Sequence, residues 1–404
     1  MRHIIIGAGP AGISAARRIR AISPKDEVII LSRDSVKPYS RMVLPYMLCG
    51  EASFEVSLLS VPEGVKLLLG EEVIKIDPKN RLLETRKGSK FSFDTLLIAS
   101  GANPFSPDVK SSFSFTVRNV EDIKGIKEAI VRVKDKPVIL AGAGLVNMEI
   151  ADALYKMGIP FTFVVRSDRL LSQILDSEAS KIFEGILLRL GCDIFKGEDI
   201  TEVEETREGI IARLSSRKVV SGSCVIFGKG VKPASEILGG TGIKVNRGVV
   251  VDEFMQTNVE GIYAAGDVAE TRDIVFGDDR LHAIWPLAVE QGKVAGSNMA
   301  GLRIKYKGSV TRNIANILGR TIFTGGMSVE DRFDVIRKKA DGEYKKVALR
   351  DGVIVGFIFI GEIKEPGAYI YAIENEIKVT PFLDKVLDGS LSVNDFRKKI
   401  YVIL

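Results

Sequence analysis

Short, uninterrupted runs of apolar residues recur along the chain and are separated by segments with a helical period. Ile4-Ile5-Ile6 and Val28-Ile29-Ile30-Leu31 are two such runs, and an Ala-rich segment that extends to about Arg20 lies between them. Apolar runs without polar alternation are typical of strands that are buried on both faces of a parallel sheet. The pattern therefore predicts a strand–helix–strand unit at the start of the chain.

The same pattern returns in the middle of the chain. Residues 137–141 and 161–165 are again apolar runs, and a segment with a helical period starts near residue 147 between them. This arrangement predicts a second strand–helix–strand unit, and alternating units of this kind are typical of an α/β protein.

The pattern changes after about residue 305. Residues 344–359 alternate between polar and apolar positions, and Arg350-Asp351-Gly352 in their middle is typical of a hairpin turn. Helical segments follow from Ala368 and from Val393. The C-terminal part is therefore predicted to be an α+β domain.

The composition is that of an ordinary folded protein. Of the 404 residues, 46% are apolar and 27% are charged, which excludes a disordered chain and predicts two or three domains. The 57 Lys and Arg residues exceed the 52 Asp and Glu residues by only five, a balance that gives no case for nucleic-acid binding. A mild basic excess still helps to dock an acidic protein. No apolar stretch approaches the ~20 residues that a membrane span needs.

The few cysteine and histidine residues limit the available chemistry. Cys49, Cys192 and Cys224 lie far apart and form no C-x-x-C pair, which fits a reducing cytoplasm. His3 and His282 are the only histidines, so we expect no metal site.

The first unit contains a glycine-rich turn of a kind that binds dinucleotides. Gly7 permits a tight turn, Gly9 lets a pyrophosphate approach the backbone, and Gly12 lets the helix pack on the strand. The helix would then face the phosphates with the positive end of its dipole. Asp34 follows Gly12 at close to the expected ~20 residues and is the candidate for holding a ribose hydroxyl. A purely structural turn, with Asp34 as a solvated loop charge, is the simpler alternative.

The turn of the second unit differs at its third glycine and at the following strand end. Gly142 and Gly144 keep the two phosphate-facing positions, whereas Asn147 replaces the third glycine. No acid ends the second apolar run, and Arg166 and Arg169 follow it. Arginine forks match phosphate geometry and favour NADP(H) over NAD(H), with two solvated surface arginines as the alternative. Two such turns imply two dinucleotides, most simply a flavin and a nicotinamide.

Together with five further segments, these motifs make the chain resemble the FAD-dependent pyridine nucleotide–disulfide oxidoreductases. The likeness covers nearly the whole chain. It is greatest to the rubredoxin and ferredoxin reductases, the NADH oxidases and the flavin domain of the NAD(P)H nitrite reductases. The five segments are residues 38–45, 93–104, 227–233, 257–267 and 285–292.

The resemblance implies an α/β fold and a division into domains. It predicts two Rossmann-like dinucleotide-binding domains of the three-layer ββα type and a C-terminal α+β interface domain. The FAD-binding domain would comprise residues 1–104 and 231–304, the inserted NAD(P)-binding domain residues 105–230, and the interface domain residues 305–404.

The resemblance also implies which residues form the two sites. Asp267 would hold the ribityl chain of FAD, with capping of a helix as its alternative role. Trp285 is either a core residue or a wall beside the flavin. The expected FAD-binding residues are Gly7, Gly9, Pro10, Ala11, Gly12, Asp34, Arg41, Val73, Ala99, Ser100, Gly101, Gly266, Asp267, Trp285 and Pro286. The expected coenzyme-binding residues are Gly142, Gly144, Asn147, Glu149, Arg166, Arg169 and Gly228.

The chain departs from the family at the redox positions. It lacks the C-x-x-x-x-C of the disulfide reductases, and Met42 stands at the aligned position of a single redox cysteine. A thioether cannot exchange disulfides, and we interpret Cys49 as a buried structural thiol. Tyr46 stands where some relatives carry a Lys paired to a Glu, here Glu149. Either Arg41 takes that pairing or the flavin environment differs, so Glu149 and Arg41 are the catalytic candidates.

These implications define a cytoplasmic FAD-dependent NAD(P)H oxidoreductase. A hydride would pass from the nicotinamide to the flavin, and electrons would leave singly to a small redox protein such as rubredoxin or ferredoxin. The alternatives are an NADH oxidase that uses O₂ and a flavin-binding subunit of a larger dehydrogenase or nitrite reductase complex. A homodimer and a complex subunit are both compatible with the sequence.

Overall fold

The computed structural model describes residues 1–105, 109, 111–133, 135–340 and 342–397. The chain forms two compact units, each built from three segments of the sequence. Unit one comprises Met1–Met42, Ser53–Asn103 and Val231–Ser309, and unit two comprises the described residues of Val43–Ala52, Pro104–Gly230 and Val310–Leu404.

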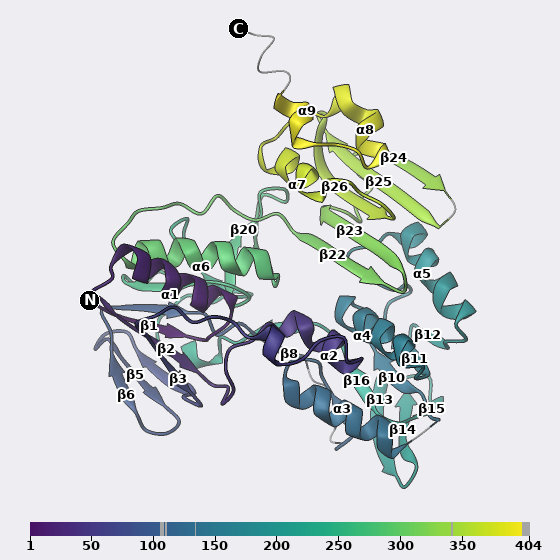
Figure 1. Cartoon of the computed structure of the whole chain (residues 1–404), viewed down its shortest axis with the longest axis horizontal. Helices are drawn as coiled ribbons and strands as arrows, with labels where there is room; N and C mark the ends of the chain where they lie inside the picture. The colour runs from purple at the N-terminus through teal and green to yellow at the C-terminus, as the bar shows by residue number, and fades with distance from the viewer. Residues whose placement is uncertain (106–108, 110, 134, 341, 398–404) are drawn as a thin grey trace. The chain divides into compact units, whose positions relative to one another are not determined.

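A five-stranded parallel sheet forms the centre of unit one (Figure 1). Ile4 lies between Ile29 and Leu96 in the register of the sheet, and all three side chains are buried. Burial on both faces explains why these strands are apolar runs. In spatial order the strands are β19 (Ile262–Ala264), β7 (Thr95–Ile98), β1 (Arg2–Ile6), β2 (Glu27–Ser32) and β3 (Val65–Leu69).

Two helices, α1 (Pro10–Ile22) and α6 (Trp285–Met299), pack side by side in unit one (Figure 1). Their backbones approach closely at two glycines of α6. A Cβ atom on Gly292 would lie 2.2 Å from the carbonyl oxygen of Ala11, and one on Gly296 would lie 2.5 Å from that of Ala15. Only glycine fits at these two positions, so the sequence of α6 sets the distance between the helices.

Smaller sheets and short helices complete unit one. The sheets are β4 (Val73–Asp77) with β5 (Leu82–Thr85) and β6 (Lys90–Ser92), β8 (Ala102–Pro104) with β17 (Val231–Pro233), and β18 (Val249–Val250) with β20 (Ala269–Arg272) and β21 (Asp279–Leu281). The short helices are η1 (Arg41–Val43), whose last residue falls in unit two, η2 (Glu55–Ser57) and η3 (Glu236–Leu238).

Unit two contains a second parallel sheet. Leu140 lies between Phe163 and Ile226 in its register, and all three are fully buried. The strands in spatial order are β12 (Ile194–Lys196), β11 (Phe161–Val165), β10 (Val138–Ala141), β16 (Val225–Phe227) and β9 (Ser114–Phe115). Around them lie α2 (Leu44–Leu48), α3 (Val120–Arg132), α4 (Leu145–Lys156), α5 (Ser177–Arg189) and the antiparallel sheet of β13 (Ile200–Thr206), β14 (Gly209–Leu214) and β15 (Val219–Gly222).

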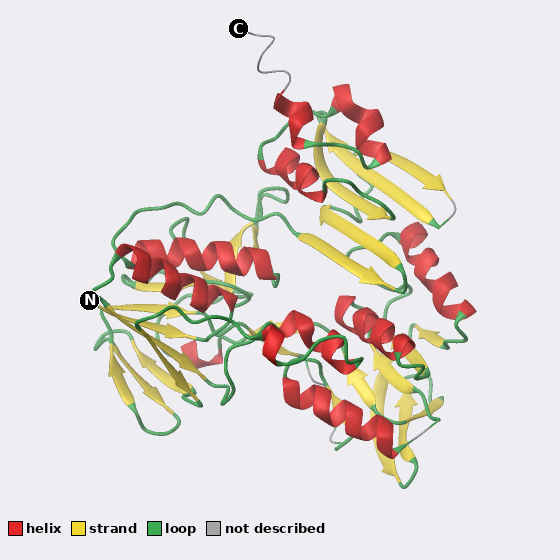
Figure 2. Ribbon diagram, viewed as in Figure 1, coloured by secondary structure: helices red, strands yellow, loops and turns green. Residues whose placement is uncertain are grey.

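The C-terminal part of unit two is an antiparallel sheet with helices on one side (Figure 2). Asp351 and Gly352 form its central hairpin turn with φ angles of +53° and +80°, so the predicted hairpin is confirmed. The strands in spatial order are β22 (Arg312–Ile317), β23 (Arg320–Gly326), β26 (Val353–Ile360), β25 (Glu343–Arg350) and β24 (Asp334–Ala340). The helices are α7 (Pro366–Glu374), η4 (Thr380–Phe382), α8 (Leu383–Asp388) and α9 (Val393–Arg397).

The predicted fold class is confirmed. Each parallel sheet contains the strand–turn–helix–strand unit that the apolar runs indicated, and β11 spans the same residues as the run 161–165. Within the described part of the chain, none of the helices combines the length and apolarity that crossing a membrane requires.

Candidate functional site

The glycine turn between β1 and α1 is tight on one side and open on the other. A Cβ atom on Gly7 would lie 2.2 Å from the carbonyl oxygen of Ala99, and one on Gly12 would lie 2.0 Å from that of Gly7. In contrast, apart from its chain neighbours, no atom of the described residues lies within 4 Å of the Cβ position at Gly9. Gly9 is the N-cap of α1, and no side chain caps the helix there. The turn therefore leaves space and backbone amides for an anionic group at the positive end of α1.

Two further loops of unit one are held beside this turn by hydrogen bonds. The Ala99-Ser100-Gly101 segment follows β7, and the Ser100 hydroxyl donates to the carbonyl oxygen of Ala234 at 2.8 Å. Gly101 has a φ of +72° and its carbonyl oxygen accepts the N–H of Ala234 at 2.9 Å. These bonds fix the ends of β7 and β17 relative to each other.

The segment Gly266-Asp267 follows β19 and lies against α1. A Cβ atom on Gly266 would lie 3.1 Å from the methyl carbon of Ala11, and the N–H of Gly266 donates to the side-chain oxygen of Gln291 at 2.8 Å. Asp267 occupies a half-buried position in a turn, and the next element is strand β20. The alternative role of Asp267 as a helix cap is therefore wrong, because no helix begins there.

The end of β2 carries an ion pair between two of the expected site residues. The guanidinium of Arg41 donates to the Asp34 carboxylate at 2.6 Å. The side chains of Arg41 and Asp34 are 29% and 30% exposed, respectively. The carbonyl oxygen of Asp34 accepts the N–H of Gly70 at 3.0 Å. Val73 begins β4 a few residues later and is buried. Asp34, Arg41 and the segment that leads to Val73 thus lie together.

Trp285 and Pro286 form the first turn of α6. The Trp285 ring is half-buried and lines a cavity of about 660 Å³ with residues of α1, among them Pro10, Ile13 and Arg17. Trp285 is therefore not a core residue in unit one, and its place beside the flavin stays a prediction.

The second glycine turn, between β10 and α4, has the same division into tight and open sides. A Cβ atom on Gly142 would lie 2.5 Å from the carbonyl oxygen of Gly228, whereas one on Gly144 would have only that oxygen near it, at 3.9 Å. Gly144 is the N-cap of α4 without a side-chain cap. This turn can likewise accommodate an anion at a helix N-terminus.

Asn147 has a structural role that the sequence pattern did not predict. Its side chain is fully buried, and its amide nitrogen lies 2.8, 3.2 and 3.3 Å from the carbonyl oxygens of Gly142, Ala141 and Ile226. A Cβ atom on Gly228 would lie 2.4 Å from the amide carbon of Asn147. Asn147 thus fastens α4 to β10 and β16 at the position where the pattern has its third glycine.

The two arginines after β11 differ in their surroundings. Arg166 is exposed. Arg169 is half-buried, and its guanidinium donates to the carbonyl oxygens of Ser172 and Leu175, at 3.3 Å each. Arg169 thus holds its own loop, and Arg166 is the better placed of the two for contact with a coenzyme.

Glu149 is a half-buried carboxyl on α4. Burial, together with the neighbouring Asp152 carboxylate, raises the pKa of Glu149 from 4.5 to about 7. The negative charge of Glu149 in turn adds to the burial that raises the pKa of Tyr46. Lys156 links α4 to the segment that follows α2, because its ammonium lies 3.1 Å from Asp152 on α4 and 2.9 Å from Glu51 in that segment. Glu149 can therefore hold or release a proton near neutral pH.

The three cysteines are free thiols in structural surroundings. Burial raises the pKa of Cys192 and of Cys224 to about 12, which makes both poor nucleophiles. Cys49 is half-buried rather than buried as we expected, and its thiol lies 3.5 Å from the carbonyl oxygen of Tyr46. Met42 is 61% exposed. Among the described residues, no group of three or more His, Cys, Asp or Glu side chains is arranged to hold a metal ion.

A sequence profile of the pyridine nucleotide-disulphide oxidoreductase family matches residues 1–292. The chain belongs to this family. It is an oxidoreductase that uses FAD together with NAD(P)H, as the sequence predicted. The residues present fit both dinucleotides, because each glycine turn is open at the N-cap of its helix and tight elsewhere.

The relatives and the solved structures agree with this membership. The epsilon subunit of the NADH-dependent phenylglyoxylate dehydrogenase of Aromatoleum evansii is 29% identical over 97% of this chain and 96% of its own length. The NADH oxidase of Methanocaldococcus jannaschii is 28% identical over 89% and 88%, respectively. The solved NADH:rubredoxin oxidoreductase of Clostridium acetobutylicum, 25% identical, superposes with a TM-score of 0.77 over 93% of this chain and 95% of its own.

Sequence reasoning missed one residue of the first site. Gln291 lies within the segment 285–292 that carries the family resemblance, yet nothing in the pattern assigned it a role. In the structure it is buried, accepts the N–H of Gly266 and lies 3.3 Å from the Thr271 hydroxyl. An amide side chain in the second turn of the helix that begins at Trp285, after the glycine–aspartate turn, is the signal that could have identified it.

Proposed function

We propose that this enzyme oxidises NAD(P)H, with a preference for NADPH, and passes electrons singly to a small redox protein of the rubredoxin or ferredoxin kind. The observation that carries the proposal is the exposed Met42 at the position of the family's redox cysteine. Reduction of a disulfide or persulfide by a thiol needs a thiolate nucleophile, whereas single-electron transfer needs none. The high pKa values of Cys192 and Cys224 support the same choice.

The first glycine turn is the proposed FAD site. FAD supplies a two-electron acceptor that can release electrons one at a time. Gly9 leaves room for the pyrophosphate, and Asp267 would accept hydrogen bonds from the ribityl hydroxyls. Gln291 fixes the Gly266 N–H and so orients the turn that carries Asp267. Arg41 would hold Asp34 in place for the adenosine ribose, and a catalytic role of Arg41 stays a prediction.

The second glycine turn is the proposed coenzyme site. Gly144 leaves room for the coenzyme pyrophosphate, and exposed Arg166 would contact the 2′-phosphate that distinguishes NADPH from NADH. Glu149, with a pKa of about 7, would hold a proton on α4 near neutral pH and so adjust the charge beside the coenzyme.

These sites lead us to propose a function for each part of the chain. We assign FAD binding to residues 1–104 and 231–304, coenzyme binding to residues 105–230, and an interface role to residues 305–404. The three free cysteines favour a reducing, cytoplasmic setting.

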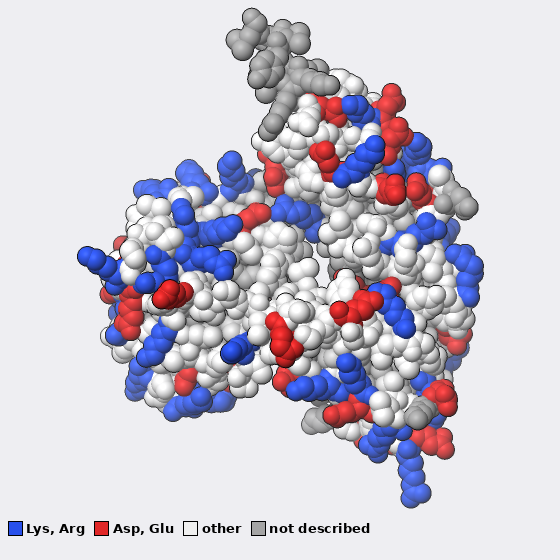
Figure 3. All heavy atoms as spheres, viewed as in Figure 1, with Lys and Arg blue, Asp and Glu red and all other residues white. Residues whose placement is uncertain are grey.

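Surface charge favours an acidic electron carrier. Lys and Arg side chains gather over α1 and α6 on the face that Figure 3 shows, and Arg17, Arg18 and Lys293 of these helices are exposed. Complementary charge raises the rate at which an acidic protein meets such a face, and salt weakens this effect. An acidic carrier would therefore react fastest at low ionic strength.

Steady-state oxidation of NADPH with a panel of acceptors tests the proposal. A rubredoxin or a ferredoxin should accelerate turnover well beyond the rate with O₂ alone, and added salt should slow the carrier-dependent rate only. NADPH consumption that equals O₂ uptake and does not respond to any carrier would instead identify an oxidase.

One relative supports a second candidate function. The phenylglyoxylate dehydrogenase protein of Aromatoleum evansii is named as a subunit of a larger NADH-dependent dehydrogenase. It matches this chain over almost the full length of both. A flavin-binding subunit would pass electrons to a partner subunit in place of a diffusing carrier. Co-purification of the tagged protein from its native cells with a stoichiometric partner would favour this function.

A further inference from the structure

The loop between β11 and α5, residues 166–176, is tied at its middle to the second glycine turn. The N–H of Leu171 donates to the carbonyl oxygen of Ala143 at 2.9 Å. Leu171 is buried and has a φ of +50°, a conformation uncommon for residues other than glycine. Such a backbone persists only where its surroundings hold it.

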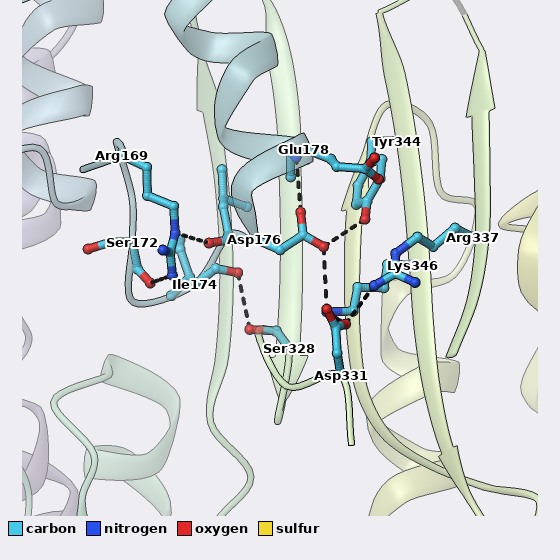
Figure 4. Close-up of polar contacts among 12 residues, drawn as sticks. Arg169, Ser172, Ile174, Asp176, Glu178, Ser328, Asp331, Arg337, Tyr344 and Lys346 are labelled. Atoms are coloured by element: carbon cyan, nitrogen blue, oxygen red, sulfur yellow. Dashed lines mark hydrogen bonds and ion pairs between the residues drawn. The ribbon is translucent and has the colours of Figure 1, made fainter. Parts of the chain in front are cut away.

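Hydrogen bonds within the loop keep it curled. The guanidinium of Arg169 reaches the carbonyl oxygens of Ser172 and Leu175 (Figure 4). The Ser167 hydroxyl donates to the carbonyl oxygen of Arg169 at 2.6 Å. Leu175 is fully buried. These hydrogen bonds link the residues on either side of Leu171 to one another.

The outer end of the loop is held by the C-terminal sheet. Asp176 caps α5 by accepting the N–H of Ala179 at 3.0 Å with one oxygen. Its other oxygen accepts the hydroxyl of Tyr344 at 2.6 Å and lies 3.5 Å from the ammonium of Lys346 (Figure 4). Ser328 adds a bond to the carbonyl oxygen of Ile174 at 3.1 Å. Both Tyr344 and Lys346 belong to β25.

The Lys346 ammonium is buried close to two carboxylates, those of Asp176 and Asp331. The side chain is fully buried, and the ammonium lies 2.8 Å from an oxygen of Asp331, whose pKa it holds below its usual range. A buried charge is costly unless it is paired, so Lys346 keeps Asp331 and Asp176 drawn together. Burial raises the pKa of Tyr344, and its hydroxyl remains a donor to Asp176.

We propose that Tyr344 and Lys346 are positioning residues for the coenzyme: through Asp176, the C-terminal sheet sets the β11–α5 loop and hence the place of Arg166. The inference rests on the proposed function, which assigns Arg166 and the second glycine turn to NADPH. It gives Tyr344 and Lys346 an indirect effect on coenzyme affinity, which acts through Asp176.

A matched pair of tyrosine variants tests this inference. Tyr344→Phe removes only the hydroxyl that holds Asp176. Tyr369→Phe is the control, because Tyr369 is equally buried but its hydroxyl donates to the carbonyl oxygen of Val386 at 3.0 Å.

Tyr344→Phe should raise the KM for NADPH and the Kd for NADP⁺ by about tenfold, which corresponds to about 1.4 kcal/mol. It should leave kcat within about twofold and FAD content unchanged, because the hydroxyl acts on coenzyme affinity alone. Tyr369→Phe should leave all these values near those of the wild type.

The outcomes separate this inference from the proposed function. Equal coenzyme affinities in Tyr344→Phe, Tyr369→Phe and the wild type would overturn the inference and leave the proposed function intact. A wild type that binds neither NADPH nor NADH would overturn both. Should Tyr344→Phe fail to fold, Asp176→Asn decides in its place, because asparagine still caps α5 but loses the charge that pairs with Lys346. An unchanged Kd for NADP⁺ in that variant would also overturn the inference.

Discussion

Gly266 and Ala11 lie so close together that a Cβ atom on the glycine would be 3.1 Å from the alanine methyl carbon. Gly266 begins the turn after β19, and Ala11 lies in the first turn of α1. The glycine-rich turn at residues 7–12 and the segment 257–267, far apart in the sequence, therefore meet at one place in unit one. This meeting sets Asp267 at the N-terminal end of α1 and makes it the first residue to test.

Asp267→Ala should strip FAD from the purified protein. The change removes a charge-assisted hydrogen bond to a ribityl hydroxyl, which is worth roughly 1.5–3 kcal/mol, or about ten- to a hundredfold in Kd. Asp267→Asn keeps an acceptor oxygen and should lose less. The ratio of flavin absorbance to protein absorbance measures both. Full FAD content in Asp267→Ala would mean that the ribityl assignment is mistaken.

Arg166→Ala and Arg169→Ala should differ in their effects on coenzyme preference. Arg166 is exposed, so its loss should raise the KM for NADPH by about ten- to a hundredfold and leave NADH nearly unchanged. Arg169 holds the carbonyl oxygens of its own loop, so its loss should weaken both coenzymes together. Kinetics with NADPH and NADH side by side would check this, and equal losses in Arg166→Ala would refute the 2′-phosphate contact.

Glu149 should make stability depend on pH. Its pKa rises from 4.5 in the unfolded chain to about 7 in the folded protein, so between these values the folded protein holds a proton that the unfolded chain has released. Stability should therefore fall as the pH rises through this window and then level off above pH 7.

Glu149→Gln removes this dependence. The variant should gain stability over the wild type at pH 8, by at most about 3 kcal/mol, and gain clearly less at pH 5. Tm measured at both pH values reports the difference, with the exposed Glu128→Gln on α3 as the control. A gain of the same size at both pH values would show that Glu149 titrates normally.

Thiol alkylation should leave turnover largely intact. Cys192 and Cys224 are buried with pKa values near 12, and only half-buried Cys49 is open to a reagent. Cys49→Ser should keep FAD, fold and activity with a one-electron carrier. Loss of turnover in a folded, FAD-loaded Cys49→Ser protein would assign Cys49 to the chemistry.

Much of the fold could be read from the sequence because its signals are local. The apolar runs predicted β1 and β2 in one parallel sheet and β10 and β11 in the other, and the glycines at positions 7, 9, 142 and 144 predicted the turns that follow β1 and β10. These residues act on their own backbone or on the next element along the chain, so spacing alone reveals them.

The contacts that escaped prediction join residues far apart in the sequence. Asn147 reaches the carbonyl oxygen of Ile226, and Asp176 reaches Tyr344. The ion pair of Asp34 with Arg41 is close in sequence but depends on how the chain turns after β2. Which polar side chains meet across such distances is decided by packing, and no periodic pattern carries that information.

The central claim is that two dinucleotides bind at the open glycines Gly9 and Gly144. Both have φ angles near −78° that any residue adopts, so Gly9→Val and Gly144→Val should fold at a cost of about 1 kcal/mol. Each variant would place a side chain where one pyrophosphate belongs, and each serves as the control for the other.

An anaerobic titration with NADPH, followed by flavin absorbance, tests this claim most directly. The wild type should contain FAD that is bleached by about one equivalent of NADPH. Gly144→Val should be yellow but resist bleaching, and Gly9→Val should be folded and colourless. FAD in the wild type that neither NADPH nor NADH bleaches, or a Gly144→Val protein that is bleached as readily as the wild type, would contradict the account.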